Sequence, residues 1–314
     1  APPESVGDYG GEIDNWRWPR HSGDFAFFRA YVGKNGLPAD YSTDNVPYQP
    51  PAFLKLASSP LGAGDLALVT GYPGHTSLLA PVVEMKSIQA SVYPERLAMF
   101  DAYLALIEQL SKDNQELAIK ATGRRRGFDN YRTKNKGELE GMQKAKLLER
   151  KQAEQAALQA FIAKDPARQK AYGNVVSEIE AAFAEAEKTR EADTALEREF
   201  LMPRLVFAAY RIARMAEERQ KPDAERDPSY QERNIPRLKD DLKAIPASFH
   251  PKLDRAFLKL ALQRDRARAP ERRTPALELI AGKDPTDAAI DAAIAKLYDK
   301  RKLDDEKLRL ELCD

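Results

Sequence analysis

The chain has 314 residues, which is long enough for two domains, and its 43% hydrophobic content is sufficient to build cores. Its 50 basic and 49 acidic side chains nearly cancel, so no overall charge points to nucleic acid or an anionic membrane as a partner. A single cysteine, Cys313, excludes an intrachain disulfide, and the spacing of cysteine and histidine predicts neither a metal site nor a cofactor.

The hydropathy of the chain predicts no membrane-spanning segment. It has no run of about 20 apolar residues, the length that a membrane-spanning helix needs. The amino end, Ala1-Pro2-Pro3-Glu4-Ser5, lacks the basic and apolar regions of a signal peptide. If the protein is exported, we expect its signal to lie further upstream.

Residues 1 to about 80 are rich in glycine, proline and short apolar runs, a pattern typical of β structure. We expect strands at 25–32, which reads as mostly buried, at 52–57 and at 65–71. The segment Lys34-Asn35-Gly36 is a hairpin signal, and residues 60–64 predict a loop before the third strand. Three strands cannot bury both faces of a sheet, so the β part is predicted to be incomplete.

From about residue 81 the composition changes to that of amphipathic helices. We expect helices at about 81–120, 138–163, 167–188, 191–219, 229–244, 251–268, 275–281, 286–300 and 303–312. Three starts are marked by a capping residue before proline, at Asp165, Thr274 and Asp284. Two apolar stripes at helical spacing are predicted to be core: Val176, Ile179, Phe183 and Ala186, and Leu253, Phe257 and Leu260.

Between two of these helices lies the run Arg124-Arg125-Arg126. We interpret it as a solvated loop, with an anion-binding site as the alternative.

One polar loop, residues 10–25, holds both tryptophans of the chain and one of its three histidines. It reads Gly-Gly-Glu-Ile-Asp-Asn-Trp-Arg-Trp-Pro-Arg-His-Ser-Gly-Asp-Phe, and it closely resembles the signature of the bacterial dipeptidyl-peptidases seven and eleven. The segment 64–74 is similar to that family's start of a second barrel, and 127–131 with 137–141 is a third match. The specific resemblance covers the first 141 residues.

The resemblance implies a serine exopeptidase with a chymotrypsin-like double β-barrel and a large inserted helical domain. The expected fold class is therefore α+β: residues 1–80 would be part of the double barrel, and residues 81–314 an inserted α-helical lid domain. The resemblance also implies peptide substrates, a homodimer, and a periplasmic or secreted location.

Asp24 lies where the loop becomes the first strand, the placement of an orienting acid in a Ser/His/Asp triad. An aspartate after glycine is otherwise a turn former, but the surrounding signature favours the catalytic interpretation. By resemblance the histidine base lies upstream of Ala1 and the serine beyond Asp314, so the chain alone is expected to be inactive. His21 is interpreted as a structural part of the signature.

An exopeptidase that removes dipeptides must recognise a free amino terminus, which calls for acceptor oxygens and an aromatic wall. Asn15 and Trp16 can supply both. By resemblance they hold the substrate's amino group together with Asn130 from the helical domain. The alternatives are core packing for Trp16 and a turn for Asn130.

The function predicted from the sequence is thus serine dipeptidyl-peptidase activity. A noncatalytic helical peptide-binding or scaffold protein is the first alternative, and a helical adaptor with an irregular amino-terminal arm is the second. The residues do not choose between the seven type, which takes hydrophobic side chains before the cleaved bond, and the eleven type, which takes acidic ones. Our slight preference for the seven type has no physical argument behind it.

Overall fold

The computed structural model describes residues 15–16, 27–55, 57–68, 77, 79–299 and 302–313. The chain divides into two compact units, Ala1–Leu79 and Ala80–Asp314.

The described part of the first unit contains a small antiparallel pair of strands, β1 (Tyr31–Val32) and β2 (Val46–Pro47). A tight turn follows β1, in which the Gly36 N–H donates to the Gly33 carbonyl at 2.8 Å. Gly36 has φ of 77°, a conformation that glycine adopts without steric penalty. The turn predicted at residues 34–36 is therefore confirmed.

The strand predicted at 25–32 is confirmed only at its end, where β1 occupies residues 31–32, and the strands predicted at 52–57 and 65–71 are wrong over their described residues. Residues 27–30, 52–55, 57 and 65–68 form no strand. The side chains of Phe27 and Phe28, predicted to be mostly buried, are 93% and 94% exposed. The physical reason is that a two-residue ladder offers no second sheet or helix to cover an apolar face.

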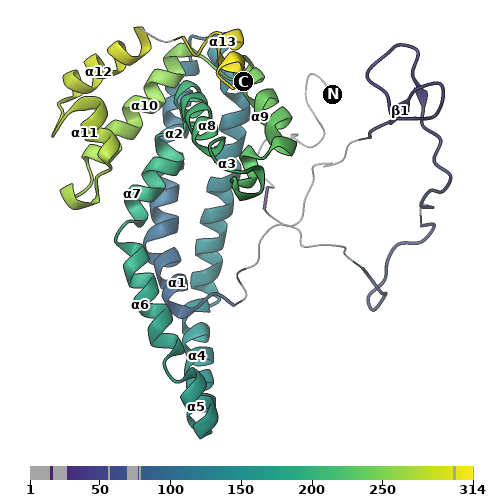
Figure 1. Cartoon of the computed structure of the whole chain (residues 1–314). Helices are drawn as coiled ribbons and strands as arrows, with labels where there is room; N and C mark the ends of the chain where they lie inside the picture. Colours follow the sequence, from purple (N-terminus) through teal and green to yellow (C-terminus); the bar gives the residue numbers. More distant parts are fainter. Residues whose placement is uncertain are drawn as a thin grey trace. The chain divides into compact units, whose positions relative to one another are not determined.

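The second unit is helical, and its elements are labelled in Figure 1. The α-helices are α1 (Val82–Ser87), α2 (Tyr93–Ser111), α3 (Gln115–Lys144), α4 (Leu147–Ala163), α5 (Pro166–Tyr172), α6 (Val175–Glu187), α7 (Arg190–Thr194), α8 (Arg204–Glu218), α9 (Ile235–Lys243), α10 (Pro251–Arg266), α11 (Pro275–Ala281), α12 (Asp287–Asp299) and α13 (Glu306–Glu311). Two π-helical turns are η2 (Ile88–Val92) and η3 (Ala195–Glu199). Short 3₁₀ turns are η4 (Asp223–Glu225), η5 (Pro228–Tyr230), η6 (Glu232–Asn234), η7 (Ile245–Ala247) and η8 (Pro270–Arg272).

Helices α2 and α3 lie side by side as a hairpin at the centre of this unit (Figure 1). The predicted helix at 81–120 is broken here, because Asn114 caps α3 by accepting a hydrogen bond from the Leu117 N–H at 2.9 Å. From Gln115 the helix continues without a break to Lys144. The loop interpretation of 124–126 and the turn alternative for Asn130 are therefore both wrong.

An aromatic cluster packs α2 and α3 against α10. Tyr103 is fully buried, its ring centroid lies 4.9 Å from that of Phe128, and it meets Phe257 edge-on at 5.4 Å. Such pairs add to the free energy gained from apolar burial. The predicted core stripe on α10 is confirmed, since Leu253 and Phe257 are buried and Leu260 packs against the same cluster.

The other predicted core stripe, on α6, is wrong. No residue of α6 is buried, and Ile179 is 39% exposed. Among the described elements, α6 packs mainly against α1 and α7. Its apolar stripe therefore lacks a second layer that would cover it.

The predicted helix starts are confirmed in part. Asp165 caps α5, accepting from the N–H groups of Ala167 and Arg168 at 2.8 and 3.0 Å. Thr274 precedes α11 as predicted, but its hydroxyl donates to the Asp265 carboxylate at 2.7 Å and does not cap the helix. Helix α12 begins only at Asp287, after the predicted cap at Asp284.

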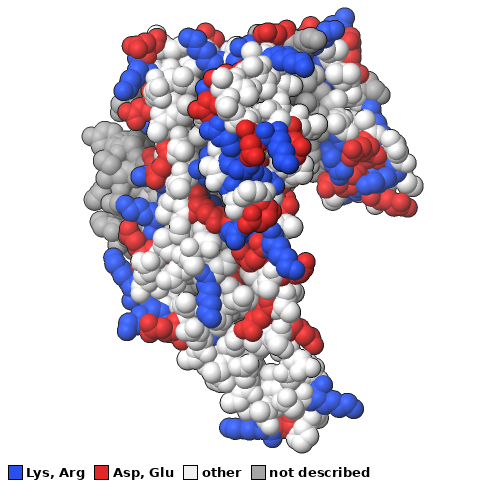
Figure 2. Space-filling view, turned by 90° about the vertical axis from the view of Figure 1, so that its left-hand side faces the viewer, with Lys and Arg blue, Asp and Glu red and all other residues white. Residues whose placement is uncertain are grey.

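Charges of both signs lie next to each other over the face of the molecule in Figure 2, in keeping with the near-zero net charge. Among the described residues, no helix is long and apolar enough to cross a membrane. The same residues hold no cluster of three or more histidine, cysteine, aspartate or glutamate side chains suited to a metal ion.

Candidate functional site

The predicted site residues fall in different parts of the structure. Asp24 and His21 lie outside the described residues. Asn15 and Trp16 are neighbours in one turn of the first unit, and Trp16 is 57% exposed with φ of 59°, an uncommon conformation for a residue other than glycine. Asn130 lies in the middle of α3, in the second unit, with its side chain half-buried.

Tyr131, the chain neighbour of Asn130, lines a cavity of about 620 Å³ in the second unit. This volume lies within the range of roughly 300–1,000 Å³ typical of small-molecule sites. We call it the α2–α3 cavity. It is lined from α2 by Tyr93, Arg96, Met99 and Phe100, from α3 by Arg124, Gly127, Phe128, Tyr131, Lys134 and Asn135, from η3 by Glu197 and Arg198, from the segment before α8 by Leu201 and Met202, and from α8 by Phe207.

The α2–α3 cavity has an aromatic wall. The Phe100 ring stacks on that of Tyr131 with centroids 6.2 Å apart. The ring centroid of Phe128 lies 6.0 Å from that of Phe100. Phe100 and Phe128 are buried in the aromatic core, whereas Tyr131 is 56% exposed. The wall is therefore held rigidly by the core of the helical unit.

Two guanidinium groups of the lining, those of Arg96 and Arg124, make no hydrogen bond or ion pair with a carboxylate among the described residues, although Glu138 and Asp254 act on them through space. Burial, and then the neighbouring Arg198, lower the pKa of Arg96. Burial and the nearby Arg204 lower the pKa of Arg124 to about 10, so it stays protonated at neutral pH. The Arg124 Nη2 atom is buried and has no hydrogen-bond partner, while its guanidinium lies 5.1 Å from the ring centroid of Phe257.

Tyr93 closes one side of the α2–α3 cavity. Its hydroxyl donates to Glu138 Oε2 at 2.6 Å, and burial together with this carboxylate raises the pKa of Tyr93 to about 12. Glu138 also pairs with Lys134 at 3.5 Å. Glu138 is thus engaged on α3 outside the cavity lining.

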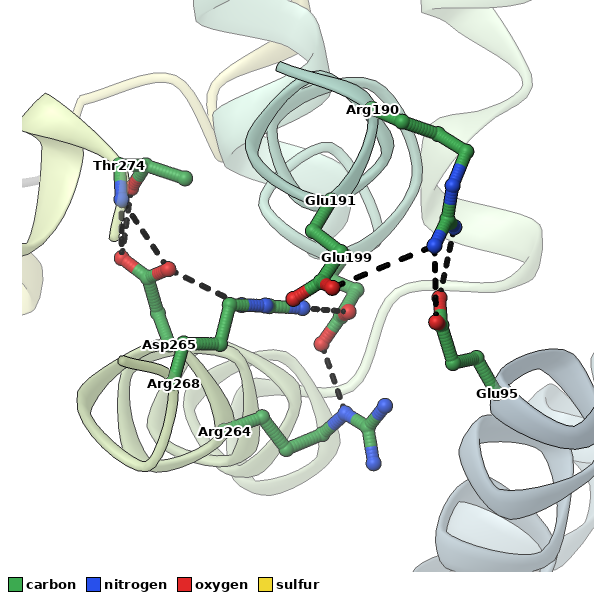
Figure 3. A network of polar contacts seen from close by, with 8 residues as sticks. All are labelled: Glu95, Arg190, Glu191, Glu199, Arg264, Asp265, Arg268 and Thr274. Atoms are coloured by element: carbon green, nitrogen blue, oxygen red, sulfur yellow. Dashed lines mark hydrogen bonds and ion pairs between the residues drawn. The ribbon is translucent and has the colours of Figure 1, made fainter. Parts of the chain in front are cut away.

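A second cavity, of about 400 Å³, shares Arg96 and Met99 with the first but has a different character. Its other arginines, Arg190, Arg264 and Arg268, each pair with a glutamate, as Figure 3 shows. Arg190 donates to both oxygens of Glu95 at 2.8 and 2.9 Å. The buried Glu199 accepts from Arg264 at 2.8 Å and from Arg268 at 2.5 Å. The first pair links α7 to α2, and Glu199 links η3 to Arg264 at the end of α10 and to Arg268 just beyond it.

The α2–α3 cavity was missed at the level of sequence, although a signal for it exists. Arg124, Phe128, Tyr131 and Asn135 recur at helical spacing and mark one face of α3. The π-helical turn η3, which brings Glu197 to the lining, has no comparable sequence signal. Such turns are frequent at functional sites.

Comparison with known proteins identifies the family. The family model described as peptidase S46 matches residues 1–314. The chain belongs to the peptidase S46 family. Among its relatives, an Asp/Glu-specific dipeptidyl-peptidase of Shewanella putrefaciens is 35% identical over 314 residues, which is all of this chain and 42% of that protein. A dipeptidyl-peptidase 7 of Porphyromonas gingivalis is 32% identical over 210 residues, covering 62% of this chain and 27% of that one.

The S46 assignment agrees with the fold. A crystal structure of Porphyromonas endodontalis DPP11 in complex with the dipeptide Arg-Glu matches with a TM-score of 0.63 and 24% identity, covering 99% of this chain and 44% of that one. At this identity the likeness shows the fold alone. The chain therefore spans less than half the length of these S46 relatives.

Proposed function

We propose that the full-length protein is a serine dipeptidyl-peptidase, which removes dipeptides from the amino terminus of peptides. The observation that carries this proposal is the peptidase S46 match over residues 1–314, supported by a 35% identical relative named as a dipeptidyl-peptidase. This family membership favours the peptidase over a noncatalytic scaffold.

In this proposal Asp24 is the orienting acid of the catalytic triad. It accepts a hydrogen bond from a histidine, fixes the tautomer of that ring and stabilises the imidazolium that forms as the serine attacks. The histidine and the serine belong to parts of the protein outside this chain. The serine forms an acyl-enzyme with the dipeptide, and water releases it.

Asn15, Trp16 and Asn130 hold the free amino group of the substrate. The asparagine side-chain oxygens accept hydrogen bonds from the ammonium group, and the indole face attracts its charge. The exposure of Trp16 and the partial burial of Asn130 on a rigid helix are compatible with these roles. The clamp explains why cleavage is limited to two residues from the amino terminus.

We also propose which domain of the full-length protein each part of the chain belongs to. Residues 1–80 contribute to a chymotrypsin-like double β-barrel, and residues 81–314 form an inserted helical lid. The likeness of the fold to DPP11 supports this proposal. Asn130 would then reach the substrate from the lid, so closure would complete the site.

For the residue before the cleaved bond we propose an acidic side chain. The relative aligned over the whole of this chain is named as Asp/Glu-specific, whereas the dipeptidyl-peptidase 7 named above aligns over 62% of it. This observation replaces our slight preference for hydrophobic side chains. Kinetics with substrates that carry Asp, Glu or Leu at that position will decide the preference.

The remaining parts of the proposal are a homodimer and a periplasmic or secreted location. Both rest on the family resemblance. Sedimentation of the full-length protein and fractionation of the producing cells test them.

The experiment for the proposed function is hydrolysis of dipeptidyl arylamides by the full-length protein. We expect cleavage of substrates with a free amino terminus and a large loss when that terminus is acetylated, because the clamp then has no ammonium group to bind. Binding of peptides without any hydrolysis would favour the scaffold alternative.

A further inference from the structure

The α2–α3 cavity is a site in its own right, apart from the amino-terminus clamp. Four cationic side chains line it, Arg96, Arg124, Lys134 and Arg198, against one carboxylate, Glu197. The same lining includes aromatic rings and the buried amide of Asn135. A cationic site with an apolar wall suits an anion that is attached to an apolar group.

The other arginines of the adjacent cavity of about 400 Å³ differ from Arg96 and Arg124 in their hydrogen bonds. There Arg190, Arg264 and Arg268 each make charge-assisted hydrogen bonds with glutamates. Arg96 and Arg124 make no such hydrogen bond in the described part of the chain, and the carboxylates of Glu138 and Asp254 act on them only through space. A carboxylate held in the cavity would add the charge-assisted hydrogen bonds that these guanidinium groups lack.

Gly127 keeps the space open. A Cβ atom built at this position meets no other atom within 4 Å, and the residue lies one helical turn from Arg124 on the same face of α3. Glycine inside a helix costs about 1 kcal/mol relative to alanine. Because Gly127 lines the cavity, a large side chain at this position would occupy part of its volume.

We propose that the α2–α3 cavity binds a carboxylate that lies next to an apolar side chain, with Arg96 and Arg124 as the carboxylate ligands and Phe100 and Tyr131 as the apolar wall. The proposal revives the anion-site alternative for the arginine run at 124–126, now limited to its first member. Resting on the proposed function, it further assigns the carboxylate to the peptide substrate, at a distance from its clamped amino group. That carboxylate belongs either to the carboxyl terminus or to an acidic side chain.

Binding is tested with three acetylated dipeptides, which cannot engage an amino-terminus clamp and cannot release a dipeptide. N-acetyl-Gly-Phe carries only a terminal carboxylate, N-acetyl-Asp-Phe-amide carries only a side-chain carboxylate, and N-acetyl-Gly-Phe-amide carries none. Calorimetry with the full-length protein should show that at least one of the first two binds roughly tenfold or more tightly than the third. Whichever does so identifies the source of the carboxylate.

The variants locate the site. Arg96→Gln and Arg124→Gln should each weaken the favoured peptide about tenfold or more, and Gly127→Leu, which fills the cavity with a better helix former, should abolish its binding. Arg125→Gln is the matched control, since Arg125 is exposed on the same helix and does not line the cavity. Circular dichroism of each variant checks that it is folded. If Arg124→Gln does not fold, Gly127→Leu still tests whether the peptide binds in the cavity.

Equal binding of the three peptides overturns the proposal, as does a preference for carboxylate that survives Gly127→Leu and Arg96→Gln. These outcomes are independent of peptidase activity. If the full-length protein hydrolyses no dipeptidyl arylamide but binds the carboxylate peptides as described, the proposed function fails and the carboxylate site stands.

Discussion

The hydroxyl of Tyr298, on α12, donates a hydrogen bond to Oδ2 of Asp254, on α10, at 2.9 Å. The same carboxylate accepts from the backbone N–H groups of Arg204 and Leu205, at 2.5 and 3.2 Å. Because these N–H groups open α8, a side chain from α10 caps a helix whose own preceding residue is Pro203. Asp254 therefore ties three helices together.

Replacing Tyr298 with phenylalanine tests this junction. Tyr298→Phe keeps the ring and removes one of the donors to a buried carboxylate, so we expect the free energy of unfolding to fall by about 1–3 kcal/mol. Urea unfolding followed by circular dichroism measures the change. Tyr210→Phe is the control, because Tyr210 is 43% exposed, and it should change the free energy by less than about 0.5 kcal/mol.

The ionisation of Asp254 gives a dependence of stability on pH. Burial raises the pKa of this carboxyl above its ordinary value of 3.8, and the hydrogen bonds that it accepts oppose the shift only in part. A raised pKa in the folded state means that the folded protein holds this proton more tightly than the unfolded chain. Its contribution is therefore fully present below pH 3.8 and is lost as the pH rises through the folded pKa.

The measurement is the free energy of unfolding of the wild type and of Asp254→Asn across this pH range. Asparagine does not titrate, so the difference, wild type minus variant, should decrease as the pH rises above about 4. A difference that increases over the same range would mean that the folded protein lowers the pKa of Asp254.

Glu199 is a buried carboxylate held by two guanidinium groups, those of Arg264 and Arg268 (Figure 3). Glu199→Gln leaves Arg264 without its counter-charge and Arg268 with Asp265 alone, in a partly buried place, so we expect a loss of about 3–5 kcal/mol in the free energy of unfolding. Asp291→Asn is the control, because it breaks an exposed ion pair with Lys259 and should cost at most about 1 kcal/mol. Equal losses of unfolding free energy for Glu199→Gln and Asp291→Asn would show that burial does not strengthen the ion pairs of Glu199.

The sequence predicted the helical unit well where periodicity and burial agree. Leu253 and Phe257 share a stripe that is core, and Asp165 before proline starts a helix as expected. The stripe on α6 failed because periodicity gives the apolar face of a helix and not whether another element covers it. Ile179 lies on such an uncovered face.

The continuous helix α3 could not be predicted from local propensity. Four glycines, Gly123, Gly127, Gly137 and Gly141, favour breaks in it, and each costs about 1 kcal/mol in a helix. Burial of Leu117, Ala121 and Phe128 against neighbouring helices outweighs this cost. Of the candidate site, the sequence named Asn130 but not the cavity beside it, because the latter depends on contacts between α2, α3 and η3.

Asn130→Ala tests the proposed amino-terminus clamp. Loss of a hydrogen bond to a charged group should lower kcat/KM of the full-length protein by roughly 10- to 100-fold on substrates with a free amino terminus. Acetylation of the substrate should then cost the wild type far more than it costs the variant. Asn174→Ala, at an exposed asparagine between α5 and α6, should leave kcat/KM unchanged. An equal effect of acetylation on wild type and Asn130→Ala would remove Asn130 from the clamp.

The most direct test of the account is the turnover of Asp24→Asn in the full-length protein on a dipeptidyl arylamide. We predict that KM stays nearly the same and that kcat falls by about 10⁴-fold, the order expected when the catalytic histidine loses the partner that fixes its tautomer. Circular dichroism of the variant checks that its fold is intact. A fall in kcat of less than about tenfold would contradict the account and make Asp24 a turn residue.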